Sequence, residues 1–278
     1  MPSATLYVIG TPLGNLGDLS TRVTEILRSV PVVAAEDTRR TRGLLSAIAA
    51  HPERLLSYHA HSRDDREALL LEILAEGRGV ALVTDAGTAG VSDPGAAMVA
   101  RARAAGHAVV PIPGPSAVAT ALSASGLPAD RFLFLGFVPR KGRERAALLE
   151  EVSRAPWTIV LFEAANRLVE LLDDLAMAAG DRDAVVCREL TKVHEEFRAG
   201  TLAELAAHYR EAPPLGEVTL VIAGNGRRPE PVAADLAAVG EAIRVALAAG
   251  ESRREVVRRV AAEFGIPRNE AYRLVMEA

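Results

Sequence analysis

The first 115 residues alternate short apolar runs with longer segments of helical periodicity, and this alternation constrains the fold more than any other feature. The apolar runs are residues 5–9, 31–35, 55–58, 80–84 and 109–112, and the helical patterns are residues 19–29, 39–50, 65–75 and 96–105. Such repetition predicts a mostly parallel sheet covered by helices. Ligands of these sheets bind beyond the carboxyl ends of the strands. We therefore expect the functional loops directly after the strands.

The pattern changes after a stretch stiffened by prolines at residues 111–115. Beyond a helical segment at 116–125, apolar runs recur at residues 132–137, 158–162, 184–187, 196–199 and 218–222. The short run at 196–199 leads directly into a helical pattern at 201–209, which favours some antiparallel strands here. The sequence therefore predicts an α/β protein with two α/β domains, residues 1–115 and 116–226.

Residues 227–278 predict a small C-terminal helical appendage, with helical patterns at 235–249, 252–264 and 268–277. Ser252 and Glu255 have the spacing of a capping box, and Gly265 and Pro267 are expected to end the second helix. Residues 251–278 contain six arginines and five glutamates. This balance fits either a solvated amphipathic tail or a module that contacts RNA.

Composition narrows the class of protein further. The longest apolar runs are much shorter than the roughly 20 residues of a membrane helix, and the N-terminus has no signal-peptide pattern, so we expect a cytoplasmic protein. The single cysteine, Cys187, excludes an intramolecular disulfide and a cysteine-cluster metal site. We predict that it is a buried, inert side chain. The formal net charge of -4 disfavours indiscriminate nucleic-acid binding but allows a local basic patch.

Four loops at the expected strand ends are rich in glycine, proline and small polar residues. They are residues 10–18 (GTPLGNLGD), 36–39 (EDTR), 85–95 (DAGTAGVSDPG) and 113–117 (PGPSA). Glycine lets a backbone approach a ligand closely, and proline fixes a loop before binding. Four such loops at successive strand ends indicate one binding site rather than unrelated turns. The first loop matches neither the P-loop nor the dinucleotide fingerprint, so the expected ligand is a nucleoside without a pyrophosphate.

These loops resemble the tetrapyrrole-methylase superfamily, in segments 10–17, 35–39, 85–88, 92–95 and 111–117. Segments 122–128, 132–136, 139–141, 188–192, 195–197 and 200–201 are similar to its branch that methylates ribose 2′-hydroxyls of ribosomal RNA. The resemblance spans residues 5–225 in the right order. Two segments depart from it. Ala89 stands where the family usually has proline, and residues 163–167 (EAANR) stand where Glu-Ser-Pro-His-Arg is more usual.

The resemblance implies a methyltransferase with S-adenosylmethionine held in the cleft between the two α/β domains. It also implies a homodimer and a decoding-centre cytidine of 16S rRNA as the target. Because recognition of a 2′-hydroxyl depends on RNA shape, we expect an assembled small ribosomal subunit as the substrate rather than naked RNA. Two alternatives stay open. The same fold could methylate a precorrin-like tetrapyrrole or a modified histidine of a protein, or the chain could be a non-catalytic, RNA-binding ribosome assembly factor.

The same resemblance implies cofactor contacts at nine positions: Leu13, Asp85, Gly87, Thr88, Ser116, Ala117, Phe162, Ala223 and Gly224. Two of them have other interpretations. Asp85 could cap a helix or close a turn, since aspartate favours both positions. Phe162 could equally be a core residue at the end of a strand.

Methyl transfer is an in-line displacement, so the protein must align the acceptor hydroxyl and give its proton a route out. Asp37 and Lys192 are the first candidates for the proton acceptor, followed by Glu36 and Glu195. A buried lysine has a lowered pKa that suits this role, but Lys192 could instead pair with a neighbouring glutamate. Asp37 could likewise pair with an adjacent arginine.

Basic residues at the mouth of the site are expected to bind RNA phosphates. The candidates are Arg39, Arg40, Arg140, Lys141 and Arg143, with Arg42 and Arg145 beside them. Alternatively, residues 140–145 are only the solvated start of a helix. His59 and His61 lack a third ligand at suitable spacing, so the sequence predicts no metal site.

Overall fold

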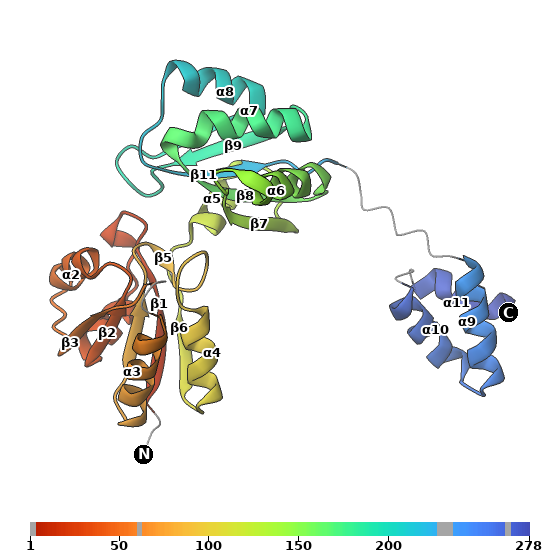
Figure 1. Ribbon diagram of the computed structural model, residues 1–278, viewed down its shortest axis with the longest axis horizontal. Coiled ribbons are helices and arrows are strands. Elements are labelled where there is room, and N and C mark those ends of the chain that lie inside the picture. Colours follow the sequence, from red (N-terminus) through yellow and green to blue (C-terminus); the bar gives the residue numbers. More distant parts are fainter. Residues whose placement is uncertain (1–3, 60–62, 227–235, 265–267) are drawn as a thin grey trace. The chain divides into compact units, whose positions relative to one another are not determined.

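The computed structural model describes residues 4–59, 63–226, 236–264 and 268–278. The chain divides into two compact units, residues 1–225 and 226–278. The first unit contains two sheets covered by helices, and the second contains helices (Figure 1). The predicted α/β class with C-terminal helices is therefore confirmed. Independent folding of residues 1–115 and 116–226 stays a prediction.

The first sheet is parallel in its main strands, as the strand–helix alternation predicts. Its order is β3 (Arg54–Ser57), β2 (Val32–Ala35), β4 (Val80–Val83), β1 (Thr5–Thr11) and β6 (Ala108–Ile112). Every residue of β2 and β4 is buried, which is typical of strands covered on both faces. The strand β5 (Gly87–Thr88) pairs antiparallel with the end of β1. It was not predicted, because two residues paired by a tertiary contact leave no periodic pattern.

Helices cover both faces of this sheet: α1 (Thr21–Ser29) and α2 (Thr38–Ala47) on one, and α3 (Arg63–Ala75) and α4 (Ala96–Ala104) on the other. The alternation of side chains along each strand produces this division. In β2, Val33 shares a core with Leu27 of α1, whereas its neighbour Val32 shares one with Met98 of α4. The carboxyl ends of the strands remain free of helices and carry the four loops.

The second sheet is mixed. Its order is β10 (Glu196–Thr201), β9 (Asp183–Arg188), β11 (Glu217–Ile222), β8 (Thr158–Ala164) and β7 (Phe132–Phe137). All pairs are antiparallel except β7 with β8, so the predicted antiparallel pairing is confirmed. Cys187 of β9 has no exposed surface, and burial raises the pKa of its thiol to about 12. The prediction of an inert, buried cysteine is thus confirmed.

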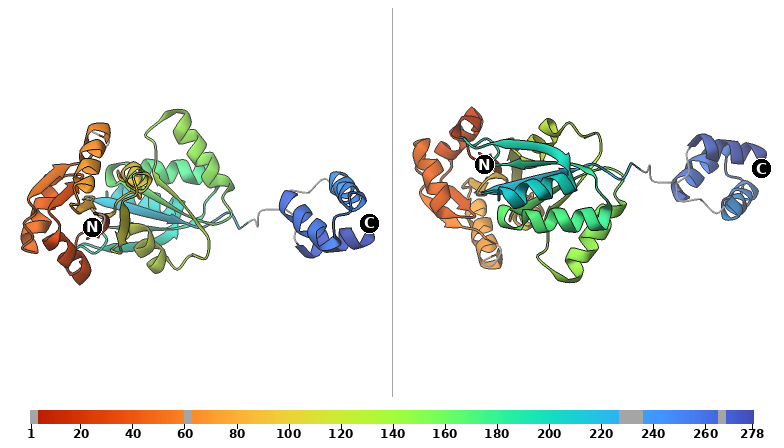
Figure 2. Two further views of the ribbon diagram at one scale, coloured as in Figure 1. Left: turned by 90° about the horizontal axis from the view of Figure 1, so that it is seen from below. Right: turned by 90° about the horizontal axis from the view of Figure 1, so that it is seen from above.

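One face of the second sheet is covered by α6 (Gly142–Arg154), α7 (Leu168–Ala179) and α8 (Leu202–Glu211), and the other by α5 (Ala117–Ser125). The view from above in Figure 2 looks onto α7 and α8. Short 3-10 helices precede α1 and α7: η1 (Leu16–Asp18) and η3 (Ala165–Arg167). Helix α5 packs on β8, β9 and β11 while partly buried Leu13, in the loop after β1, packs on the same core.

The second unit has its own core. Helices α9 (Leu236–Ala248), α10 (Arg253–Glu263) and α11 (Arg268–Glu277) bury Val239, Ile243, Val256, Val260 and Val275 together. The predicted capping box of Ser252 and Glu255 is present. The predicted stop at Gly265 and Pro267 lies outside the described residues. No helix in the described part of the chain has the length and apolarity needed to span a bilayer.

Candidate active site

The four glycine- and proline-rich loops line one cavity of about 570 Å³. Leu13 follows β1, Glu36 follows β2, Asp85 follows β4 and Ser116 follows β6. Because the parallel strands end at the same edge of the first sheet, their loops converge there. The second sheet supplies the other wall of the cavity, from the following residues: Phe137, Phe162, Glu163, Glu217, Val218 and Thr219. The cavity is therefore built from both sheets.

Two of the loop glycines stand where the Cβ atom of a larger residue would be too close to a neighbouring segment. A Cβ atom on Gly114 would lie 2.5 Å from the carbonyl oxygen of Gly10, and one on Gly14 would lie 2.4 Å from Cγ of Lys192. Both distances are far below normal van der Waals separation. Glycine thus allows the loop after β6 to touch the loop after β1, and allows Lys192 to cross the latter loop.

Seven of the nine predicted cofactor positions line the cavity: Leu13, Asp85, Gly87, Thr88, Ser116, Ala117 and Phe162. Ala223 and Gly224 are not brought there. They follow the last residue of β11, whereas the first three residues of that strand, 217–219, face the cavity. At about 3.3 Å per residue, the strand carries them to the opposite end of the sheet. The sequence of a strand alone does not show which of its two ends meets the site.

Phe162 combines the two roles considered for it. It is half-buried, and its ring meets Phe134 at 4.9 Å and Phe137 at 5.4 Å in edge-to-face arrangements. Phe134 belongs to the core beneath, whereas Phe137 is exposed at 62% and lines the cavity with Phe162. The rings of Phe137 and Phe162 form an apolar wall that suits a flat heterocycle.

Asp85 lines the cavity and also fixes the loop after β2. One carboxylate oxygen accepts a hydrogen bond from the backbone N–H of Asp37 at 3.0 Å, and the other lies 3.5 Å from a guanidinium nitrogen of Arg40. These contacts hold the N-terminus of α2 against the loop after β4. Asp85 therefore ties two of the four loops together.

Glu36, Asp85 and Asp93 form an acidic wall of the cavity. Burial, then the charge of Asp85, raises the pKa of Glu36. Burial, then the charge of Glu36, raises the pKa of Asp93 to about 6, and the nearby hydroxyl of Thr84 partly offsets this rise. Sequence reasoning missed Asp93 as a site residue. The available signal was its position inside the loop at 85–95. The sequence does not show that Glu36, from the loop after another strand, lies near Asp93 in the fold.

The three predicted catalytic residues differ in their surroundings. Glu36 lines the cavity. The side chain of Asp37 caps α2 instead: it accepts from the N–H of Arg39 at 2.7 Å and pairs with its guanidinium at 3.2 Å. Hydrogen bonds from Arg39 lower the pKa of Asp37. Asp37 is thus not among the residues that line the cavity.

Lys192 pairs with a glutamate, as the alternative interpretation expects. Its ammonium group lies 3.1 Å from Glu189 and 3.8 Å from Glu217. The same oxygen of Glu189 accepts the N–H of Glu217 at 3.2 Å. Since Glu217 lines the cavity, Lys192 borders the site through this pair.

Backbone strain gathers around the cavity. Among the described residues, four other than glycine have a positive φ, and three of these are Ser92 (φ 59), Glu189 (φ 50) and Thr191 (φ 66). Ser92 lines the cavity, and the other two lie just before Lys192 in the chain. Strain of this kind persists where the surroundings fix the backbone, and it is common at functional sites.

The predicted RNA-binding residues lie on two exposed helix starts. Arg39 and Arg40 begin α2, with side chains exposed at 87% and 63%. Arg140, Lys141 and Arg143 surround the start of α6 and are exposed. Contact with RNA stays a prediction for these five residues.

Arg145, beside that second group, has a structural role instead. It is buried, and its guanidinium pairs with Asp174 at 2.6 Å and donates to the carbonyl of Pro139 at 3.0 Å. These bonds fix the start of α6 against α7, so Arg145 is not available to a phosphate.

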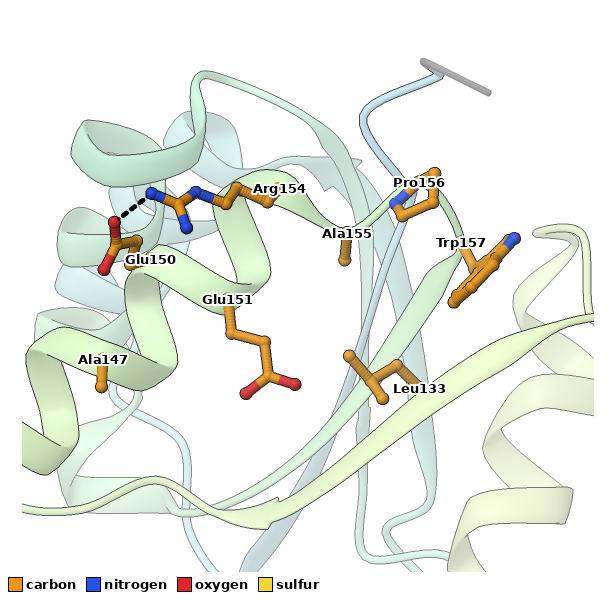
Figure 3. Close-up of a pocket in the computed structure, with 8 residues that line it drawn as sticks. All are labelled: Leu133, Ala147, Glu150, Glu151, Arg154, Ala155, Pro156 and Trp157. Carbon is orange, nitrogen blue, oxygen red and sulfur yellow. Dashed lines mark hydrogen bonds and ion pairs between the residues drawn. The ribbon is translucent and has the colours of Figure 1, made fainter. Parts of the chain in front are cut away.

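A second hollow, of about 340 Å³, lies between β7 and α6 (Figure 3). Its wall includes Trp157, Leu133 and the ion pair of Glu150 with Arg154. None of the predicted site residues line it. In the described part of the chain, no group of three metal-ligating side chains could hold a metal ion. His61 lies outside that part.

Comparison with known proteins identifies the family. The family model described as Tetrapyrrole (Corrin/Porphyrin) Methylases matches residues 5–206. "Ribosomal RNA small subunit methyltransferase I" of Halalkalibacterium halodurans is 40% identical over 97% of this chain and 94% of its own. The protein of the same name from Synechocystis is 42% identical over 98% and 97%, and that from Escherichia coli O157:H7 is 39% identical over 98% and 94%.

Solved structures agree on the fold. Uroporphyrin-III-C-methyltransferase from Thermus thermophilus aligns with a TM-score of 0.57 at 21% identity, over 80% of this chain and 96% of its own. Diphthine synthase aligns with a TM-score of 0.60 at 17% identity, over 80% and 90%. The chain therefore belongs to the tetrapyrrole methylase family and is a methyltransferase related over almost its whole length to proteins named ribosomal RNA small subunit methyltransferase I.

Proposed function

We propose that this protein transfers a methyl group from S-adenosylmethionine to the ribose 2′-hydroxyl of a decoding-centre cytidine in 16S rRNA. The observation that carries the proposal is the cavity that joins the four loops to the second sheet, in a chain whose relatives are named for methylation of small-subunit RNA. Its volume of about 570 Å³ suits a nucleoside joined to an amino acid.

The lining of the cavity fits S-adenosylmethionine. Leu13, Val118 and Phe162 offer apolar surface to an adenine ring, and Thr88 and Ser116 offer hydroxyl groups to its polar edges. The carboxylates of the acidic wall suit a ligand that carries positive charge. When bound, S-adenosylmethionine supplies a methyl group activated by a positively charged sulfur.

The acceptor hydroxyl must lose its proton, and Glu36 fits this role better than Asp37. A raised pKa makes a carboxylate a stronger base, whereas a lowered pKa makes it a weaker one. Glu36 is of the first kind and lines the cavity, and Asp37 is of the second kind and caps α2. Lys192 is proposed as a positioning residue, because its ammonium group orients Glu189 and Glu217 at the cavity wall.

RNA would approach over the two exposed helix starts. Arg39 and Arg40 stand beside Glu36 at the cavity, and Arg140, Lys141 and Arg143 follow Phe137 of the cavity wall. Phosphate contacts from such residues position RNA without reading its sequence. We propose an assembled small subunit as the substrate, a homodimer as the active form and the cytoplasm as the location.

The C-terminal unit is proposed to help dock the substrate. Its helix α10 exposes Arg253, Arg254, Arg258 and Arg259 while Val256 and Val260 face the core of the unit. Because this unit has its own core, residues 229–278 can be deleted without opening the cores of residues 1–225. We expect the deletion to reduce methylation of small subunits and to leave cofactor affinity unchanged. Unchanged turnover would exclude the docking role.

The test is transfer of a labelled methyl group from S-adenosylmethionine to small ribosomal subunits from cells that lack the enzyme. We expect label at one nucleotide whose 3′ linkage resists alkali, as a 2′-O-methyl group requires. Label at an alkali-sensitive position would refute ribose methylation. Cofactor binding without any transfer to RNA would instead favour a tetrapyrrole or protein acceptor, and failure to bind the cofactor would favour a non-catalytic assembly factor.

A matched pair of variants tests the choice of base. Glu36→Gln should lower kcat by roughly 10²-fold or more, which is the usual contribution of a general base. Asp37→Asn retains a side-chain oxygen that can cap α2, so its kcat should fall by less than about threefold. Equal losses in both variants would overturn the assignment of Glu36.

A further inference from the structure

The charge of the cavity is strongly one-sided. Among the described residues, five carboxylates and one basic side chain line it: Glu36, Asp85, Asp93, Glu163 and Glu217, against Arg40. Two of the acids are neutralised locally. Arg40 lies 3.5 Å from Asp85, and Arg167 lies 3.0 Å from Glu163. Glu217 is exposed and lies 3.8 Å from Lys192.

Glu36 and Asp93 take part in none of these ion pairs, although the charge of Arg40 partly offsets the rise in the pKa of Glu36. In the described part of the chain, neither carboxylate has a basic nitrogen within 4.0 Å in an ion pair. They come from different loops, after β2 and after β5, and they repel each other across the cavity. An arrangement that keeps two such carboxylates together is costly in the free protein unless a positive charge joins them.

The backbone around Asp93 keeps it in this unfavourable place. Ser92 on one side has a φ of 59°, and Gly95 has a φ of 149°. A Cβ atom on Gly95 would lie 3.1 Å from the backbone nitrogen of Gly90, so the loop is folded tightly on itself. The backbone of this loop is therefore held in a tight conformation on both sides of Asp93.

We propose that Asp93, together with Glu36, makes the cavity selective for the positive charge of the methyl donor over its neutral product. This inference rests on the proposed function. Transfer breaks the bond between sulfur and the methyl carbon, the electron pair of that bond stays on sulfur, and the methyl carbon bonds to the ribose oxygen. The hydroxyl proton passes to a base. S-adenosylhomocysteine is left with an uncharged sulfur, and it loses the attraction of the carboxylates.

The consequence is release of the spent cofactor. Donor and product share the adenosine and amino-acid parts, so the contacts of the apolar wall are equal for both. They differ in the transferred methyl group and in the charge on sulfur, and a half-buried carboxylate interacts with that charge more strongly than one in water. Asp93 is thus a specificity-determining residue whose removal should weaken binding of the donor and spare the product.

The experiment is calorimetric titration of S-adenosylmethionine and S-adenosylhomocysteine into the wild-type protein and the Asp93→Asn variant. We expect the variant to bind the donor about tenfold more weakly and the product within about twofold of wild type, since one charge pair of this kind is worth about one logarithmic unit. The control is Asp173→Asn. It removes an exposed carboxylate of α7 that pairs with Arg210 of α8, and it should change neither affinity.

A second readout needs no variant. The groups that face Asp93 in the cavity are Glu36, Asp85, Arg40, Glu163 and Glu217. Lowering the pH from about 7.5 to about 5.5 protonates Asp93, so the ratio of product to donor dissociation constants should fall in wild type and stay nearly constant in Asp93→Asn. If the affinities for donor and product changed equally, or if the ratio of their dissociation constants depended on neither the variant nor the pH, the inference would be overturned and the proposed function would stand. Failure of wild type to bind S-adenosylmethionine would overturn the proposed function with it.

Discussion

Gly114→Ala tests whether the contact between the loops after β1 and β6 builds the cavity. The added Cβ would lie 2.5 Å, 2.7 Å and 2.8 Å from three backbone atoms of Gly10. Carbon atoms in contact normally stay about 3.5–4.0 Å apart. The two loops must therefore separate by about 1 Å, and neither side offers a flexible side chain that could move instead.

The expected loss of stability follows from this geometry. Overpacking costs typically about 1–3 kcal/mol, and a clash of backbone against backbone belongs at the upper end, about 3 kcal/mol. For a folded unit of this size, about 2–4 °C of melting temperature is lost per kcal/mol, so the midpoint should fall by roughly 6–12 °C. Differential scanning calorimetry measures it. Since Ser116 follows two residues later and lines the cavity, S-adenosylmethionine should also bind more weakly.

The matched control is Gly43→Ala in the middle of α2. A Cβ atom there meets no atom within 4 Å. Alanine is favoured over glycine in a helix by about 1 kcal/mol, so this variant should melt roughly 2–4 °C higher than wild type. If the two variants melted within about 2 °C of each other, the contact between Gly10 and Gly114 would not be the constraint that we infer.

Three further predictions concern the surroundings of the cavity. Gly14→Ala should displace Lys192, whose Cγ would lie 2.4 Å from the new Cβ, and should lower both kcat and the melting temperature. The double variant with Lys192→Ala should recover the wild-type melting temperature. No recovery would contradict the close passage of Lys192 over Gly14. Asp93→Asn should be more stable than wild type by about 1 kcal/mol at neutral pH. Folding raises the pKa of Asp93 to about 6, so the ionised carboxylate destabilises the folded protein above that pH, and this cost disappears as the pH falls and the group is protonated. Chemical denaturation near pH 7.5 and pH 4.5 measures this, and an advantage that persists at the lower pH would contradict it. The double variant Arg140→Ala, Lys141→Ala should bind small subunits more weakly. The slope of log affinity against log salt concentration should also fall by the equivalent of up to about two phosphate contacts. An unchanged slope would show that these residues do not contact RNA.

The first sheet was predictable because its signals are local. Each buried strand is a short apolar run, and each covering helix has an apolar face, so β2 and α2 can be located from residues 31–50 alone. The loops between them were also predictable, because glycine and proline mark them. Helix α7 was not predicted, although its buried residues Leu168, Leu171, Leu172 and Leu175 have helical spacing. That spacing lies between the apolar runs of β8 and β9, which dominate the pattern in this part of the chain.

The acidic wall was only partly predictable, for a physical reason. Glu36 and Asp85 follow apolar runs and could be singled out, but their effect on Asp93 depends on two loops that meet only in the fold. Glu217 is harder still, because an antiparallel strand reverses the end that faces the site. The same reversal moved Ala223 and Gly224 away from the cavity. Residue types at strand ends thus predict a site, whereas the charge balance inside it needs the three-dimensional arrangement.

Stability and ligand charge are linked at this site. Glu36 and Asp93 repel each other in the free protein, and the tight loop with Ser92 and Gly95 prevents their separation. At neutral pH a cation that enters the cavity relieves that repulsion, so the free energy that destabilises the empty site strengthens binding of a charged donor. The variant that raises stability at neutral pH should therefore be the one that loses discrimination between donor and product. An Asp93→Asn protein that gained stability and kept its discrimination would separate the two effects and show that the repulsion serves another purpose.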